Sequence, residues 1–335
     1  PDGTFSWLTL EGKKWNFDNI GLLSSIVDLN GNTTRLIYDD EGRLNKVIDP
    51  TARELLFSYY EETDKISSIA DPAGRLFEYF YDSQWNLSRV KSPDGAETGY
   101  FNEDTRYPHF ITKVIDGNGN ITATFQYDDQ GRGIEMAGPN GIGNVSLEYK
   151  SEDETVVINS LGNQINYKFE TKDGIKLVSR VEGPFAPGAT PQGFIGITWD
   201  EHFNMTSFSD RNGNTFGYEY DEWGNQAVIT NQLGGVIRMT YEPESDRMTG
   251  IKDQLSRTHC LEYDAKGNLI KITNPLEEIT AITYDEKGLV TGITDAFQRT
   301  VSYSYDQYGY LSGLTNPLEQ QWGFSYDILG NLTGQ

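Results

Sequence analysis

The chain has 335 residues, with 50 Asp and Glu against 27 Lys and Arg, and therefore a formal net charge of −23. This balance argues against DNA, RNA and anionic membrane surfaces as partners, because phosphate binding needs a basic surface. The single cysteine, Cys260, excludes an intrachain disulfide, and no apolar run is long enough for a transmembrane helix. No signal peptide opens the sequence, and we expect residue 1 to lie inside a longer protein.

The N-terminal part carries a pattern in which Tyr-Asp is followed by Gly. Phe17-Asp18 takes the Tyr-Asp position first, and the turn sequence Asp28–Asn32 separates it from Tyr38-Asp39 with Gly42. Asp49-Pro50 and Asp71–Arg75 are further turn sequences, and the second leads to Tyr81-Asp82. This spacing predicts strands separated by short turns.

The middle of the chain is less regular. Asn102-Glu103 is a degenerate repeat, and residues 103–113 are expected to form a lengthened turn. The pattern resumes at Tyr127-Asp128 with Gly131. Residues 183–198 are rich in Pro and Gly and are expected to be an irregular insertion and a poor strand. Trp199-Asp200 reopens the pattern, which continues with Tyr220-Asp221 and Gly224.

The last quarter repeats every 21 residues without a gap, which is typical of a repeat array. Each repeat has Tyr and Asp, then Gly three residues after the Asp. The four sets are Tyr263, Asp264, Gly267; Tyr284, Asp285, Gly288; Tyr305, Asp306, Gly309; and Tyr326, Asp327, Gly330.

Residues two apart share a strand face, and before each of these tyrosines one face is mostly apolar while the other is small and polar. The Asp-x-x-Gly segment predicts a turn. In the second strand of each repeat, apolar residues three apart and a Gly between them (Gly292, Gly313, Gly334) suggest a bulge. Two strands and two turns in each repeat predict roughly 15 hairpins in one continuous antiparallel sheet. We therefore expect an all-β fold and a single repeat array over residues 1–335.

The segments Tyr79-Phe80-Tyr81-Asp82, Tyr218–Asp221 with Gly224-Asn225, and Asp71–Arg75 resemble the YD repeat of Rhs proteins. The resemblance covers residues 15–335. It implies a β-sheet that curls as part of a spiral shell, as in bacterial Rhs toxins, the C subunits of insecticidal toxin complexes and teneurins. It also implies an enclosed toxin domain and the remaining shell as partners. We find no sequence that matches the family's self-cleaving segment, so that activity is not carried over.

Two sets of acidic residues are candidates for chemistry. Asp264, Asp285, Asp306 and Asp327 would form a row of carboxylates, yet identical repeated groups lack the asymmetry of a catalytic pair, and turn formation explains them better. Segments 28–32, 116–120 and 210–214 resemble the start of a calcium loop but place Gly at the fourth position, so we expect no metal site there.

His259 and Cys260 are adjacent in a predicted strand and would point to opposite faces, so we expect packing rather than a catalytic pair. His109 and His202 complete no triad or zinc spacing. Trp85 and Trp223 lie inside turns and are the aromatic residues expected to be exposed, where they could contact a glycan.

The leading hypothesis is a non-catalytic shell segment, with no cofactor, that encloses a toxin or effector domain for delivery. The alternative is a recognition module that binds a glycan or a partner protein. Both place the protein outside the cell that makes it, secreted or on a cell surface, and neither requires this segment to insert into a membrane. An enzyme ranks only third among the hypotheses, because no catalytic site can be assembled from these residues.

Overall fold

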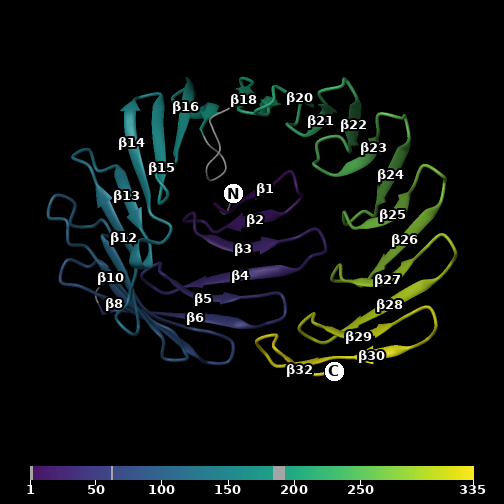
Figure 1. Ribbon diagram of the computed structural model, residues 1–335. Helices are drawn as coiled ribbons and strands as arrows, with labels where there is room; N and C mark the ends of the chain where they lie inside the picture. The colour runs from purple at the N-terminus through teal and green to yellow at the C-terminus, as the bar shows by residue number, and fades with distance from the viewer. Residues whose placement is uncertain (1–2, 62, 184–192) are drawn as a thin grey trace. The chain divides into compact units, whose positions relative to one another are not determined.

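The protein is built from short antiparallel strands joined by tight turns, as the computed structural model shows for residues 3–61, 63–183 and 193–335. Figure 1 labels the strands in chain order and shows consecutive strands side by side within each part. Thirty strands belong to one sheet, and the last two, β31 and β32, form a separate pair. The expected all-β antiparallel fold is confirmed.

The chain divides into two compact units, and the first consists of residues 1–76, 221–227 and 237–335. Its N-terminal strands are β1 (Phe5–Leu8), β2 (Lys14–Phe17), β3 (Leu23–Val27), β4 (Thr33–Tyr38), β5 (Leu44–Ile48), β6 (Glu54–Tyr59) and β7 (Ile66–Ala70). Each of these pairs with the next in antiparallel register.

The C-terminal strands of the first unit cover the regular repeats. They are β22 (Val236–Tyr241), whose first residue belongs to the second unit, β23 (Met248–Lys252), β24 (Thr258–Tyr263), β25 (Leu269–Thr273), β26 (Ile279–Tyr284), β27 (Val290–Thr294), β28 (Thr300–Tyr305), β29 (Leu311–Thr315), β30 (Gln321–Gly323), β31 (Ser325–Tyr326) and β32 (Leu332–Gly334).

The second unit consists of residues 77–220 and 228–236. Its strands are β8 (Leu76–Tyr81), β9 (Leu87–Lys91), β10 (Glu97–Phe101), β11 (Lys113–Asp116), β12 (Ile121–Tyr127), β13 (Gly133–Ala137), β14 (Val145–Ser151), β15 (Glu154–Asn159), β16 (Gln164–Lys172), β17 (Ile175–Glu182), β18 (Phe194–Trp199), β19 (Met205–Ser209) and β20 (Thr215–Tyr220). A short 3₁₀ helix, Pro139–Gly141, precedes β14, and β21 (Gln226–Thr230) has residues in both units.

The insertion predicted at 183–198 is partly wrong. Phe194–Trp199 forms strand β18, which pairs with β17 and β19. The strand propensity of the β-branched residues Ile195, Ile197 and Thr198 outweighs the low propensity of the nearby glycines. Residues 184–192 of the predicted insertion lie outside the described residues. The lengthened turn is present, since no strand lies between Phe101 and Lys113.

The predicted face pattern is confirmed along β28. Val301, Tyr303 and Tyr305 are half-buried, whereas the alternating Thr300, Ser302 and Ser304 are exposed. In the described part of the chain the only fully buried hydrophobic residues are Val156, Val181 and Val228. Among the described residues, therefore, most side chains of the apolar face are half-buried, and those of β1 are exposed.

The predicted bulge is present between the two apolar residues of the second strand, Val290 and Ile293. Tyr284 pairs with Val290 and Thr283 pairs with Gly292, so Thr291 is the extra residue and Gly292 stays in the ladder. A Cβ atom on Gly292 would lie 2.9 Å from the Thr283 hydroxyl, which explains why Gly is found opposite Thr283. Among the described residues, no helix is long and apolar enough to cross a membrane.

Candidate functional site

The repeat tyrosines connect each hairpin to the one before it. The Tyr284 hydroxyl donates a 2.8 Å hydrogen bond to the carbonyl of Leu269, and Tyr305 donates equally to Val290. Leu269 and Val290 are the residues paired with the preceding repeat tyrosines. The same bond, from a tyrosine to the carbonyl 15 residues earlier, is made by Tyr38, Tyr59, Tyr220, Tyr241 and Tyr263.

These bonds lie at the bulges, where the regular ladder is interrupted and an additional donor is useful. Trp199 takes the tyrosine position once, and its indole Nε1 donates to the carbonyl of Val178 at 2.9 Å. Tyr127 and Tyr149 reach carbonyls 16 residues earlier.

Burial raises the pKa of seven of these tyrosines, namely Tyr38, Tyr59, Tyr127, Tyr241, Tyr263, Tyr284 and Tyr305. For Tyr284 the larger cause is loss of solvent around the phenol and the smaller is the negative charge of Asp264. For Tyr127 burial alone raises the pKa. Both causes favour the neutral hydroxyl, which is the form that donates the hydrogen bond.

The aspartates that follow the tyrosines close their own turns. One carboxylate oxygen of Asp264, Oδ1, accepts 2.9 Å hydrogen bonds from the amides of Lys266 and Asn268. The other, Oδ2, accepts from the side-chain amide of Asn268 at 2.9 Å. In the described structure, Asp285, Asp306 and Asp327 receive the same two backbone bonds. Each of these carboxylates thus accepts hydrogen bonds from the backbone of its own turn.

The segments that resemble calcium loops use their acidic residues in the same way. Asp116 accepts from the amides of Asn118 and Asn120 and from the Asn120 side chain, at 2.8–2.9 Å. The Asn120 side-chain bond is the main cause of a lowered Asp116 pKa. Among the described residues no group of three or more His, Cys, Asp or Glu is placed to hold a metal ion.

Turns from the N-terminal strands meet turns from the C-terminal repeats inside the first unit. Asn30 and Asn268, 238 residues apart, exchange two 3.0 Å side-chain hydrogen bonds. Asn32 donates to the carbonyl of Lys287 at 2.8 Å. The Arg53 guanidinium lies over the Tyr310 ring, 5.3 Å from its centroid. Nothing in the 21-residue period distinguishes these residues, so sequence reasoning missed them.

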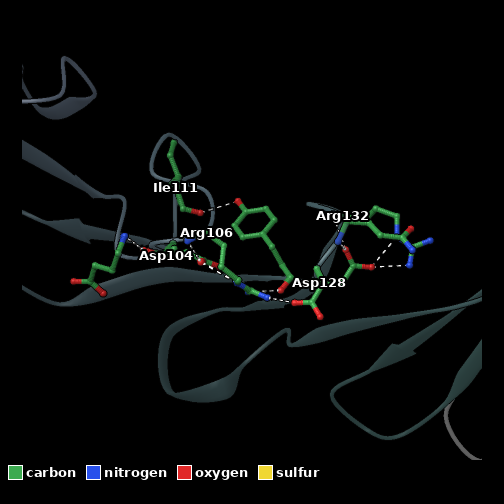
Figure 2. A network of polar contacts seen from close by, with 10 residues as sticks. Asp104, Arg106, Ile111, Asp128 and Arg132 are labelled. Atoms are coloured by element: carbon green, nitrogen blue, oxygen red, sulfur yellow. Dashed lines mark hydrogen bonds and ion pairs between the residues drawn. The ribbon is translucent and has the colours of Figure 1, made fainter.

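The lengthened turn of the second unit is held by Arg106, as Figure 2 shows. Its guanidinium contacts Asp104 at 2.8 Å, Asp129 at 2.6 Å and the Tyr127 carbonyl at 2.9 Å. Tyr127 in turn donates to the carbonyl of Ile111. The neighbouring Asp128–Arg132 ion pair belongs to the next Tyr-Asp turn. This network fixes the turn against the hairpin of β12 and β13.

Both candidate tryptophans are exposed, Trp85 to 47% and Trp223 to 41%. Trp85 occupies the position that Gly takes in other repeats, with a φ of 61°, and its ring lies 6.1 Å from that of Tyr81. Phe297 is more exposed than either, at 74%. Trp85 and Trp223 lie in turns after different repeat tyrosines, the first in the second unit and the other in the first unit.

His259 lies in the first unit, whereas His109 and His202 lie in the second. His259 pairs across the ladder with Ile251 and is exposed rather than packed, and Cys260 is also exposed. His109 lies 2.6 Å from the side-chain oxygen of Asn86, a contact that attaches the lengthened turn to the Trp85 turn.

A family model described as the teneurin YD-shell matches residues 14–235 and 205–334. A search of curated protein sequences finds no match. Among solved structures, the chain is similar to TcdB2-TccC3-Cdc42, with 13% identity and a TM-score of 0.63 over 96% of this chain and 21% of that chain.

The form of TcdB2-TccC3 without its hypervariable C-terminal region gives 14% identity and a TM-score of 0.63 over 96% of this chain and 21% of that chain. The Tc holotoxin pore of Photorhabdus luminescens gives 14% identity and a TM-score of 0.61, with the same coverage. This chain thus spans about a fifth of the length of these structures, and at such identities the likeness shows the fold.

Proposed function

The chain belongs to the teneurin YD-shell family, and from that premise we propose that it is a non-catalytic stretch of shell wall that encloses a toxin or effector domain. A structural shell role follows from the family itself. Enclosure of a second domain is the step that we add, together with the absence of catalysis.

The observation that carries the proposal is the half-buried apolar face. In a self-sufficient globular domain such a face packs against a second layer, and large side chains become fully buried. Here the described residues include no large side chain that is less than 2% exposed. A single-layered wall with a partly open aromatic face is suited to surrounding another polypeptide.

We further propose that residues 1–335 form one repeat array. The repeat tyrosines, aspartates and glycines would then be structural throughout. The tyrosine hydroxyl bonds support this role, because each one ties a hairpin to its predecessor.

The partners that we propose are the enclosed domain and the remaining shell of the parent polypeptide. The similar structures are complexes of TcdB2 with TccC3, and one of them lacks a hypervariable C-terminal region. We propose delivery outside the producing cell, by secretion or on a cell surface, as the setting in which enclosure would be useful.

Protease protection tests the proposal. The natural polypeptide that carries this array is digested intact, and again after the wall is weakened by combining Tyr284→Phe with Tyr305→Phe. We expect a domain outside residues 1–335 that resists digestion in the first case and is cut faster in the second. Equal cutting in both cases, or the absence of any further domain, would contradict enclosure.

Recognition of a glycan remains the second candidate, because Trp85 and Trp223 present exposed indole rings in turns. A glycan array screened with the wild type, Trp85→Ala and Trp223→Ala tests it. Phe297→Ala is the matched control, since it removes an exposed aromatic residue from a different row of turns. Binding that is lost only in the tryptophan variants would support recognition.

A further inference from the structure

The first unit contains two kinds of turn that already fit each other. We call the turns after the repeat tyrosines the Tyr-Asp turns, and the turns that complete each repeat the closing turns. They lie at opposite ends of the strands, because successive hairpins alternate between them. In the first unit, the closing turn Asp28–Asn32 contacts the Tyr-Asp turns Asp264–Asn268 and Asp285–Leu289.

This contact has a knob-and-hole geometry. A Cβ atom on Gly267 would lie 2.7 Å from Cδ1 of Leu29, and one on Gly288 would lie 2.5 Å from Nδ2 of Asn30. The glycines of the Tyr-Asp turns therefore leave space that side chains of the closing turn fill. The paired amides of Asn30 and Asn268 fix the register of the two rows.

The same unit holds a second set of knobs that nothing covers. The closing turns of the regular repeats place Leu276, Phe297 and Leu318 at the third turn position, the position of Asn30, and these side chains are 77%, 74% and 79% exposed. Leu255 occupies the same position one repeat earlier and is also exposed. Apolar residues in a row at turn tips are costly in water and indicate a contact surface.

The unit also holds a second set of holes. In the N-terminal Tyr-Asp turns, no atom lies within 4 Å of the Cβ position of Gly21 or of Gly42. Ile20, beside the first of these, is 74% exposed. Both rows recur every two strands, roughly 10 Å apart, so knobs and holes have the same spacing.

We propose that a second copy of this chain docks its N-terminal Tyr-Asp turns onto the exposed closing turns Leu255, Leu276, Phe297 and Leu318. The contact would repeat, between copies, the one that Leu29 and Asn30 make within the first unit. It joins two different surfaces, so each copy keeps one free row of each kind and further copies can add head to tail. This inference does not depend on the enclosure of a second domain.

Charge sets the conditions for this association. Each copy carries a net charge of −23, and long-range repulsion between copies is screened by salt. The closing-turn row is apolar at its tips, whereas the N-terminal Tyr-Asp row has Ile20 at one tip and the exposed Asp40 and Glu41 at the next. We therefore expect association to strengthen as the salt concentration rises.

Sedimentation velocity over a range of concentrations measures the association. In Leu276→Glu combined with Phe297→Glu, and separately in Ile20→Glu, we expect the dissociation constant to rise by at least about tenfold. All three side chains are exposed, so the fold should survive the changes. Leu161→Glu is the matched control, because Leu161 is an exposed apolar residue in a closing turn of the other unit and should leave association unchanged.

Mixing the two blocked variants distinguishes head-to-tail docking from other modes. The Leu276→Glu, Phe297→Glu copy keeps its N-terminal Tyr-Asp turns, and the Ile20→Glu copy keeps its closing turns. The mixture should restore dimers with a dissociation constant near that of the wild type. Any of three results would overturn the proposal. The wild type could stay monomeric in high salt, the mixture of blocked variants could stay monomeric, or Leu161→Glu could lose association as fully as the blocked variants do. Association abolished by Trp7→Lys in β1 alone would also overturn it, because that result would assign the contact to the strand edge.

Discussion

Tyr284 and Asp285 are neighbours in the chain but stabilise different connections. The tyrosine hydroxyl reaches back to Leu269 in the preceding hairpin, whereas the carboxylate accepts the amides of Lys287 and Leu289 in its own turn. One residue holds the repeats to each other and the next holds the hairpin closed. This division explains why the two residue types recur together.

The first prediction concerns the tyrosine hydroxyl. Tyr284→Phe removes the donor to Leu269 and leaves the ring in place, so the free energy of unfolding should fall by about 0.5–1.5 kcal/mol. Tyr303→Phe is the control, because the described structure shows no hydrogen bond from the Tyr303 hydroxyl. Urea unfolding of the two variants provides the comparison, and equal losses would contradict the role assigned to the hydroxyl.

The second prediction concerns Gly288, which closes the Asp-x-x-Gly turn after Tyr284. The observed φ is +81°, in the region that disfavours side chains. Gly288→Val should lower stability by about 1 kcal/mol or more. Thermal unfolding tests this, and an unchanged midpoint would count against it.

A matched alanine pair separates turn strain from loss of the contact with Asn30. Gly224 has a similar φ of +84° with no atom within 4 Å of its Cβ position, whereas a Cβ atom at Gly288 meets the Asn30 side chain. Gly288→Ala should therefore destabilise more than Gly224→Ala. The reverse order would mean that the Asn30 contact contributes nothing.

At the scale of the hairpin, alternation of apolar and polar residues predicted the strands, their faces and the existence of a bulge. It did not locate the extra residue, because register depends on which side chain fits opposite the repeat strand. Gly292 lies beside the Thr283 hydroxyl and stays paired, so Thr291 is displaced instead. The lengthened turn after β10 was visible as a break in the pattern, but its arginine network was not.

The third prediction concerns that network. Arg106→Met removes contacts to Asp104, Asp129 and the Tyr127 carbonyl, so amides of residues 103–112 should exchange hydrogen faster while the rest of the sheet keeps its protection. Arg75→Met is the control, because Arg75 pairs with Asp71 of its own turn. Hydrogen exchange followed by mass spectrometry resolves the two regions, and unchanged exchange at 103–112 would show that Arg106 does not hold the turn.

At the scale of the whole molecule, the pH dependence of stability comes from two kinds of side chain that recur along the chain, the turn aspartates and the repeat tyrosines. Side-chain hydrogen bonds from Arg299 and from Asn331 are the main causes that lower the pKa values of Asp295 and Asp327. A lowered pKa in the folded state gives stability that is present above the unfolded pKa, about 3.9, and is lost as the pH falls through the folded value. Burial raises the pKa values of repeat tyrosines such as Tyr263, Tyr284 and Tyr305, so their contribution to stability is lost as the pH rises above about 10.

The fourth prediction is a stability plateau between about pH 5 and pH 9, with losses on both sides. Urea midpoints measured in high salt, which screens the net negative charge, should fall below about pH 4. Arg299→Met removes the main cause of the Asp295 shift and should make the acid side less steep. A flat midpoint from about pH 3 to pH 7 would contradict the assignment.

The 21-residue period predicted the all-β array and its neighbouring contacts, since both follow from local spacing. It could not predict that Asn30 meets Asn268, because that contact depends on small twists accumulated over many strands. The pattern did place Trp199 in a tyrosine position, but it could not show that the indole would donate a hydrogen bond to a preceding strand.

The central claim is that the tyrosine-aspartate period builds hairpins whose turns, far apart in sequence, meet inside the first unit. A disulfide between Asn30→Cys and Asn268→Cys, in a Cys260→Ser background, tests it most directly. The account predicts that this disulfide forms within monomers, in high yield and without loss of stability. Failure to form it, or its formation only between copies, would mean that the hairpins do not meet as described.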